Sequence, residues 1–175
     1  MVIITTPTKE DARGIQNVFY QTWLATYPNA ELGITKEDIE ESFKNAFTEK
    51  NLTELAERLT EPQEGGVVVV AKDGDRVVGI CRAFIREKVN QLQAIYVLSE
   101  YQRQGVGARL WGEALKFLDK NKDTIVHVAT YNTQAISFYK KLGFEDTGKR
   151  FTEERHRMLV SGVLIPEMEM LIRCS

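Results

Sequence analysis

Two glycines, Gly105 and Gly107, stand where the segment Tyr-Gln-Arg-Gln-Gly-Val-Gly (101–107) enters a stretch with helical spacing. A glycine inside a helix costs roughly 1 kcal/mol relative to alanine, so two at one helix start need another explanation. A backbone without side chains exposes its N–H groups. Together with the positive end of the helix dipole, such groups bind anions such as phosphate. The turn therefore predicts a phosphate-binding loop.

Other interpretations of this turn fit the neighbouring residues less well. A dinucleotide fingerprint needs a third Gly or Ala three residues after Gly107, where Leu110 stands. A Walker loop needs Gly-Lys followed by Ser or Thr, which the segment lacks. A glycine turn that binds no ligand stays open on these residues alone.

The remaining groups with nucleophilic or acid–base chemistry are few. His127 alternates with apolar residues in a strand, which favours a packed or edge residue over a base, and His156 lies in a charged segment expected to be a solvated loop. Cys81 has no histidine nearby in the sequence, so we expect a core residue and no acyl-cysteine route. Because Cys81 and Cys174 do not have metal-ligand spacing, we predict no metal site.

Acidic side chains are concentrated in one stretch. Residues 31–64 hold ten acidic and four basic side chains. Carboxylates, and aromatic side chains such as Trp23 and Tyr27 just before them, suit a cationic ligand through charge pairing and cation–π attraction. The alternative is that the acids form solvated helix faces with the lysines of the same stretch.

Length and net charge limit the class of protein. The 175 residues are enough for a sizeable core, and we expect a single domain over 1–175. A net charge of −2 argues against general binding to nucleic acid or to an acidic membrane surface. The sequence shows neither a leader pattern nor a run of about 20 apolar residues. We expect a cytoplasmic protein.

Hydrophobic spacing predicts the elements that position these groups. An apolar strand, Val2 to Thr5, precedes Thr8-Lys-Glu-Asp11, which has the residues of a capping box and predicts a helix to about Ala25. Thr35-Lys-Glu-Asp38 repeats this signal and opens one or two amphipathic helices. The first third of the chain is therefore expected to be helical.

From Gly65 onward the pattern predicts a sheet. Two apolar runs flank an Asp-Gly turn and predict a hairpin, and residues 92–98 predict a third consecutive antiparallel strand. The order that follows, strand–helix–strand–helix, predicts parallel pairing at this end. We expect a helix from Gly105 to Lys120, a strand from Thr124 to Ala129, a helix from Asn132 to Leu142 capped by Gly143, and strands near 144–151 and 165–173. Met168 and Met170 could serve either the core or a dimer interface.

Two segments carry a resemblance to a known family. Residues 92–107, LQAIYVLSEYQRQGVG, look like a Gln/Arg-x-x-Gly-x-Gly/Ala cofactor loop, and residues 132–144, NTQAISFYKKLGF, like an Asn-x-x-Ala-x-x-Phe-Tyr signature. Their order and separation resemble the GNAT superfamily of N-acetyltransferases. The resemblance implies an α/β (α+β) fold with a central mixed, mostly antiparallel twisted sheet of about seven strands and helices on both faces.

The resemblance also implies acetyl-coenzyme A (acetyl-CoA) as the acyl donor, with its pyrophosphate at the glycine turn. In this family the strand before the turn splays from its neighbour, and its freed backbone groups bind the pantetheine arm. The cofactor-binding residues that this implies are Ile95, Tyr96, Val97, Gln102, Arg103, Gln104, Gly105, Val106, Gly107 and Asn132.

Amine acylation also needs a proton for the departing thiolate. Tyr139 matches the family's tyrosine near the cofactor sulfur and is the expected general acid. Without the resemblance, Phe138 and Tyr139 would be an ordinary buried aromatic pair. Gln93 stands about where many relatives have a glutamate, so the base stays unassigned and Gln93 is expected to position a water or the substrate.

The resemblance places the N-terminal helices at the acceptor site, so Trp23, Tyr27 and Gln93 are the expected substrate contacts. We expect acetyl transfer to a small cationic, polyamine-like primary amine, with a protein N-terminus or lysine as the alternative. A non-catalytic acetyl-CoA sensor would keep the glycine turn and could dispense with Tyr139. A homodimer and acyl groups longer than acetyl stay open.

Overall fold

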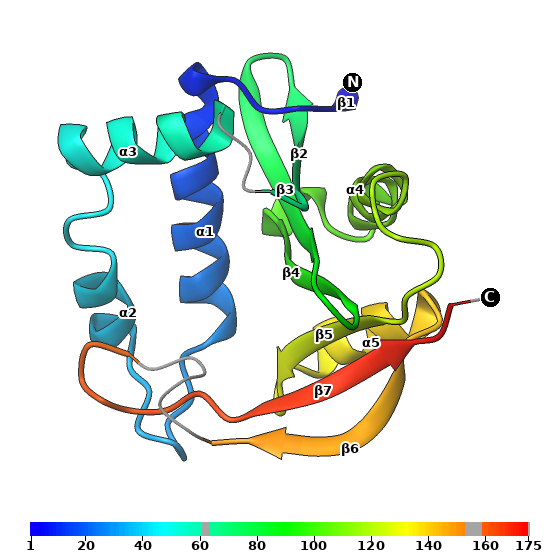
Figure 1. Cartoon of the computed structure of the whole chain (residues 1–175). Coiled ribbons are helices and arrows are strands. Elements are labelled where there is room, and N and C mark those ends of the chain that lie inside the picture. Colours follow the sequence, from blue (N-terminus) through cyan, green and yellow to red (C-terminus); the bar gives the residue numbers. More distant parts are fainter. Residues whose placement is uncertain (61–63, 153–158, 175) are drawn as a thin grey trace.

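The computed structural model of the chain describes residues 1–60, 64–152 and 159–174. Figure 1 shows the N-terminal helices together on one side of a twisted sheet and α4 on the other side. His156, expected in a solvated loop, lies outside the described residues. In chain order the elements are β1 (Val2–Thr5), α1 (Ala12–Thr26), α2 (Lys36–Ser42), α3 (Glu49–Thr60), β2 (Gly66–Asp73), β3 (Arg76–Ile85), β4 (Asn90–Val97), α4 (Val106–Leu115), β5 (Thr124–Ala129), α5 (Thr133–Lys141), β6 (Glu145–Phe151) and β7 (Glu167–Ile172).

Seven strands form one mixed sheet in the order β1-β2-β3-β4-β5-β7-β6. Every neighbouring pair is antiparallel except β4 and β5, which are parallel. This confirms the predicted fold class, the hairpin and the parallel pair. The insertion of β7 between β5 and β6 was not predicted, because hydrophobic spacing along the chain does not reveal the order of strands in a sheet.

The hydrophobic core lies on both faces of this sheet. Ile15 and Val18 of α1 are fully buried on one side, and Leu110 of α4 is fully buried on the other. Met168 and Met170 belong to the same core. Because they are buried within the chain, their packing needs no second subunit to explain it.

Both predicted capping boxes are present at the N-terminal helices. The Thr8 amide donates to Asp11 at 2.9 Å, and the Asp38 amide donates to the Thr35 hydroxyl at 3.1 Å. The first box opens with a turn of 3-10 helix, so α1 begins at Ala12. Asp11 also pairs with Lys72 of β2 at 2.7 Å. This ion pair fastens the start of α1 to the sheet.

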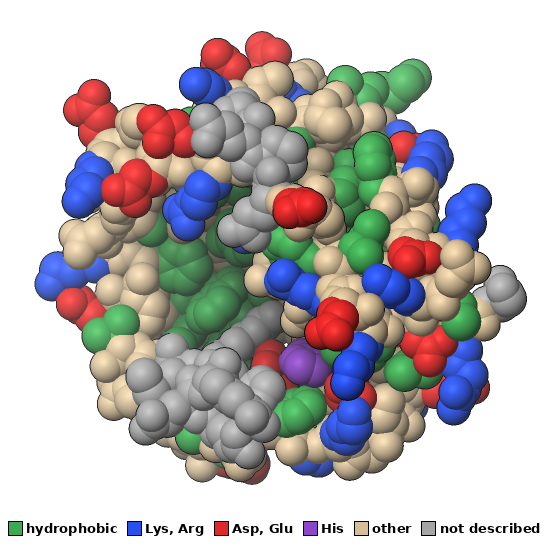
Figure 2. Space-filling model, viewed as in Figure 1, with side chains coloured by type: hydrophobic (Ala, Val, Ile, Leu, Met, Phe, Trp, Pro, Cys, Tyr) green, Lys and Arg blue, Asp and Glu red, His purple; other side chains and the backbone are tan. Residues whose placement is uncertain are grey.

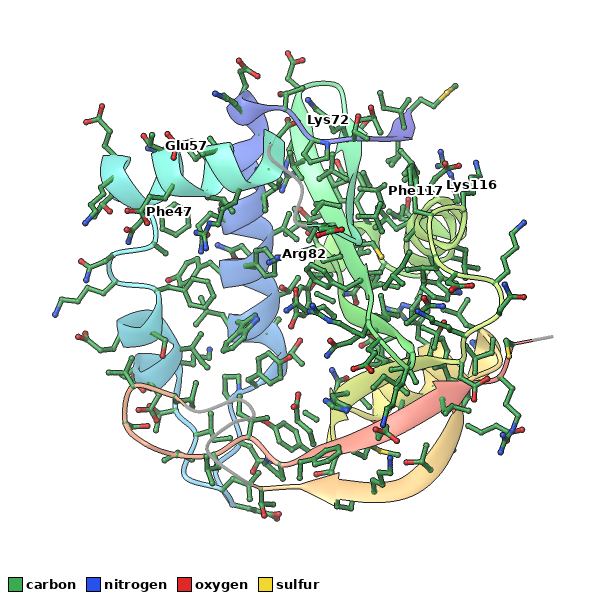
Figure 3. All side chains as sticks on the ribbon, in the orientation of Figure 1. Phe47, Glu57, Lys72, Arg82, Lys116 and Phe117 are labelled. Atoms are coloured by element: carbon green, nitrogen blue, oxygen red, sulfur yellow. The ribbon has the colours of Figure 1, made fainter. Side chains whose placement is uncertain are left out.

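The helix α4 is shorter than predicted, because it ends at Leu115 and not near Lys120. Phe117 is 57% exposed, and Figure 3 shows Lys116 and Phe117 at the outer side of α4. Asn90, at the start of β4, donates to the Asp119 carbonyl at 2.8 Å and accepts from the Asp119 amide at 3.2 Å. These bonds draw the chain toward the sheet and stop the helix, while Leu118 still reaches the core.

The cysteines lie apart and are both free within the described structure. Cys81 is buried in the core, as predicted, and burial raises the pKa of its thiol, whereas Cys174 is exposed. Residues 1–60, 64–152 and 159–174 contain no group of three or more His, Cys, Asp or Glu side chains placed to hold a metal ion. Nor does any helix within these ranges combine the length and hydropathy needed to cross a bilayer.

Candidate active site

A cleft opens in the middle of the sheet where β4 and β5 diverge. Their parallel pairing covers only Asn90–Leu92 of β4 and Thr124–Val126 of β5. Beyond this point, residues 93–97 and 127–129 line a cleft with a volume of about 370 Å³. A strand edge without a partner presents free N–H and C=O groups. The β4 wall can therefore form backbone hydrogen bonds with an extended ligand.

Gln93 lies at a bulge where this cleft begins. Arg82 of β3 pairs with Ala94 of β4, while the next β3 residue, Ala83, pairs with Leu92, so Gln93 has no partner on β3. A β-bulge bends the strand and redirects a side chain. The exposed Gln93 side chain consequently borders the cleft, where a bound molecule would meet it.

The turn between β4 and α4 presents a row of unpaired backbone amides. Arg103 and Gly105 have left-handed φ angles of 59° and 78°, and α4 begins immediately afterwards. The N–H groups of residues 103–108 form no hydrogen bond with any described residue, whereas the Arg109 amide donates to the Gly105 carbonyl at 3.0 Å. Consecutive free amides at a helix start form a concavity that binds anions.

Side-chain amides fasten this turn to the elements around it. The Gln102 amide donates to the Val97 carbonyl at 2.8 Å, and its oxygen accepts from Gln134 of α5 at 2.7 Å. Gln104 donates to the Glu100 carbonyl at 2.7 Å. The turn is thus held in place by bonds that leave its own N–H groups free.

Gly105 and Gly107 are required for different physical reasons. A Cβ at Gly105 would meet nothing within 4 Å, so its left-handed conformation explains the glycine. A Cβ at Gly107 would lie 3.1 Å from the Phe138 ring of α5. Gly107 therefore does more than expose a backbone N–H group, because the missing side chain also lets α4 and α5 pack closely.

Tyr139 of α5 reaches the cleft from the side opposite β4. Asn132 caps this helix, because its side-chain oxygen accepts from the Ala135 amide at 3.0 Å. Tyr139 is 6% exposed and lines the cleft. Burial, with a smaller contribution from Tyr96, raises the pKa of its phenol. The hydroxyl is therefore protonated at neutral pH and can donate a proton or a hydrogen bond.

A cluster of tyrosines connects α1 with the two walls of the cleft. The Tyr27 and Tyr96 hydroxyls lie 3.1 Å apart, and the Tyr131 hydroxyl donates to the Tyr27 carbonyl at 2.9 Å. Burial raises the pKa of Tyr96, and burial together with the charge of Glu167 raises the pKa of Tyr131 to about 12. Only the backbone of Tyr96 was predicted to take part in the site, because local spacing does not indicate a side-chain contact with Tyr27, 69 residues earlier.

Two buried carboxylates of β7, Glu167 and Glu169, were missed in the sequence. Glu169 pairs with Lys149 at 3.0 Å and with His127 at 3.5 Å. Burial works to raise the pKa of Glu169, but the hydrogen bond and charge of Lys149, together with a hydrogen bond from His127, outweigh it and lower the pKa. His127 lines the cleft and packs on the Phe151 ring, so the expected packed histidine also faces the candidate site.

A second cavity of about 280 Å³ adjoins the cleft on the α1 side. It is lined by Gln16, Phe19, Trp23, Phe43, Arg82, Gln93, Ala94 and Tyr96. Gln93, Ala94 and Tyr96 border both cavities. Figure 2 shows a hollow on this face of the molecule, with hydrophobic side chains on its floor.

The described acidic side chains of residues 31–64 do not form a wall of either cavity. None of the described acids between 31 and 64 lines the cleft or the adjoining cavity, and Glu61 lies outside the described residues. Glu41 and Glu54 instead pair with Lys44 and Lys50 on exposed helix surfaces. The structure thus favours the alternative of solvated helix faces over the expected acidic acceptor wall.

Most residues predicted for the site come together in the structure. Trp23 lines only the adjoining cavity, and Gln104, Gly105 and Val106 border neither cavity. Gln104 and Gly105 contribute through the turn, while Val106 is buried in the core. Those that line the cleft are Tyr27, Gln93, Ile95, Tyr96, Val97, Gln102, Arg103, Gly107, Asn132 and Tyr139.

Curated relatives match about half of this chain. N-acetyltransferase 8 of Homo sapiens is 31% identical over 97 residues, covering 51% of this chain and 43% of the relative. The probable N-acetyltransferase san of Drosophila melanogaster is 35% identical over 98 residues, covering 51% of this chain and 53% of the relative. The chain thus spans about half the length of the curated relatives it matches.

Solved structures resemble the whole chain at lower sequence identity. The PaiA N-acetyltransferase of Thermoplasma acidophilum, solved in complex with coenzyme A, has a TM-score of 0.74 at 20% identity, with 99% of both chains covered. At this identity the similarity shows the fold alone. Residues 34–144, more than half of the sequence, match the acetyltransferase (GNAT) family. The chain therefore belongs to the GNAT family of acetyltransferases.

Proposed function

We propose that this chain, acting as a single domain, transfers the acetyl group of acetyl-CoA directly to a primary amine. The observation that carries the proposal is the row of unpaired amides at 103–108 beside a cleft that separates two parallel strands. Phosphate oxygens suit these amides. A long arm attached to a phosphate that is bound by these amides would lie along the free edge of β4. The donor groups therefore fit coenzyme A.

In this proposal, different residues bind different parts of the cofactor. The amides of 103–108 and the Arg103 side chain hold the pyrophosphate. The backbone groups of Ile95–Val97 that bond neither β3 nor Gln102 bind the arm, and Asn132 contributes its side-chain NH₂ because its oxygen already caps α5. Bound acetyl-CoA supplies an acetyl thioester whose carbonyl carbon accepts the amine.

Tyr139 is the proposed proton donor to the departing thiolate. Its raised pKa keeps the phenol protonated, and its burial at the cleft excludes competing solvent. Gln93 carries a neutral amide and cannot take the proton of the amine, so we propose that it orients the amine or a water at the rim. The amine proton then leaves through water.

The proposed acceptor is a small primary amine that enters from the adjoining cavity. Trp23 and Tyr96 border this cavity and Tyr27 borders the cleft, and their aromatic faces attract cations. The polyamine-like acceptor expected from the sequence has less support, because the described carboxylates of residues 31–64 do not line the cavities. A protein N-terminus or a lysine could reach the same cavities, and a cofactor sensor would need only the amide row.

The test combines product detection with a variant of the proton donor. Wild-type protein should release thiol from acetyl-CoA and give an acetylated amine, by mass spectrometry, with at least one member of a panel of amines and short peptides. Tyr139→Phe should lose about 100-fold or more in kcat and keep its affinity for coenzyme A. Tyr101→Phe, whose hydroxyl bonds Asp73 outside the cleft, is the matched control. Unchanged turnover in Tyr139→Phe would remove the assigned acid, and coenzyme A binding without turnover would favour the sensor.

A further inference from the structure

Arg82 of β3 is a cation in the adjoining cavity, and no described residue pairs with it as an anion. Figure 3 shows its side chain in the space between β3 and α1. Its Nε is buried and has no hydrogen-bond acceptor, and Arg82 takes part in none of the ion pairs among the described residues. The other described residues that line this cavity are uncharged. Within the described part of the chain, the positive charge of Arg82 is therefore not neutralised.

The surroundings of Arg82 disfavour that charge. Burial, together with the nearby positive charge of Arg58, lowers the pKa of Arg82, although a guanidinium remains protonated in proteins. Its described aromatic contact is the Phe84 ring, whose centroid lies 5.5 Å from the guanidinium carbon. Burying a charge is unfavourable unless an opposite charge pairs with it. An anion that entered this cavity would provide the missing partner.

The position of Arg82 connects this charge to the proposed reaction. Gln93, Ala94 and Tyr96 border both cavities, so one small molecule can extend from the cleft to Arg82. Resting on the acetyl transfer proposed above, we infer that the acceptor amine carries an oxyanion, a carboxylate or a phosphate, which Arg82 binds. The planar guanidinium suits either group, because two parallel N–H bonds match two oxygens. A polyamine lacks such a group and would face the charges of Arg82 and Arg58.

Pairs of amines that differ in one oxyanion test this inference. Lysine and cadaverine differ by a carboxylate, as do ornithine and putrescine, and phosphoethanolamine differs from ethanolamine by a phosphate. Binding would be measured by calorimetry in the presence of coenzyme A, and kcat/KM by thiol release. The oxyanion-bearing member of at least one pair should bind about tenfold tighter or more. The pair that shows the preference identifies the oxyanion.

Variants of two neighbouring arginines make the test specific. Arg82→Gln should abolish the preference, and Arg82→Lys should retain part of it. Arg86→Gln is the matched control, because Arg86 lies over the same Phe84 ring but bonds Gln91 and borders neither cavity. Unchanged affinity for coenzyme A would show that each variant is folded.

The outcomes separate the two proposals. Equal binding within every pair, or a preference that survives in Arg82→Gln, would overturn the anion site while leaving acetyl transfer in place. An Arg82-dependent preference in binding without acetylation of any amine would support the anion site and overturn the proposed reaction.

Discussion

Gly107 and Gly112 lie in the same helix, and only Gly107 has a neighbour where a Cβ would stand. Alanine at Gly112 should stabilise the protein by about 0.5–1 kcal/mol through helix propensity. Alanine at Gly107 gains the same term but pushes against Phe138, so Gly107→Ala should be less stable than Gly112→Ala by about 1–2 kcal/mol. Urea denaturation of both variants measures the difference in the free energy of unfolding. Equal stabilities would show that the Phe138 ring of α5 moves aside without destabilising the protein.

The residues proposed to bind the cofactor could be named from the sequence, whereas those of the proposed acceptor side could be named only in part. Residues 102–107 lie in one continuous segment whose glycines indicate the chemistry, and Tyr139 lies in a second motif. Arg82 and Glu167 come from strands far apart in the sequence and look there like ordinary strand residues. How deeply these side chains are buried, and which groups lie around them, depends on tertiary packing, which local spacing does not encode.

At the scale of elements, comparing the two capping boxes separates the contribution of one ion pair to stability from that of helix capping. Asp11 and Asp38 make similar capping contacts, but only Asp11 forms an ion pair among the described residues, with Lys72. Because asparagine also caps helices, Asp38→Asn should change stability by less than about 1 kcal/mol. Asp11→Asn should cost about 1–3 kcal/mol at neutral pH, since it leaves Lys72 without its charged acceptor.

The same pair predicts a dependence of stability on pH. Burial works to raise the pKa of Asp11, but bonds from Lys72 and the Thr8 amide outweigh it and hold the pKa below its ordinary value of 3.8. A carboxyl with a lowered folded-state pKa stabilises the protein fully above that ordinary value, and the contribution disappears as pH falls through the folded pKa. Denaturation between pH 7 and pH 2 should therefore show the gap between wild type and Asp11→Asn closing at acidic pH. A gap independent of pH would assign the loss to packing.

The predicted elements were correct where their signals are local and less accurate where distant contacts decide. Thr8 and Thr35 mark their helix starts, and Gly143, with a φ of 97°, ends α5 as expected. The end of α4 is set by hydrogen bonds from Asn90, about 30 residues earlier in the chain, which spacing within the helix does not indicate. The helical pattern therefore extended the predicted helix five residues, 116–120, beyond the observed end of α4.

At the scale of the whole molecule, the parallel pair β4–β5 determines the position of the site. The antiparallel part of the sheet holds β4 from one side, while β5 and β7 continue in another direction, as Figure 1 shows. The sequence predicted this parallel pair and helices on both faces, because element order constrains them. It did not predict that β7 would insert between β5 and β6, a placement that pairs Glu167 and Glu169 with residues of β5 that line the cleft.

The central claim is that the row of amides at 103–108 and the free edge of β4 hold coenzyme A. Amide hydrogen exchange with and without coenzyme A tests it most directly, since these N–H groups make no bond within the described structure. We predict that coenzyme A slows exchange at 103–108 and at 95–97, and leaves the hairpin of β2 and β3 unchanged. Exchange at 103–108 that stays the same at saturating coenzyme A would contradict the account.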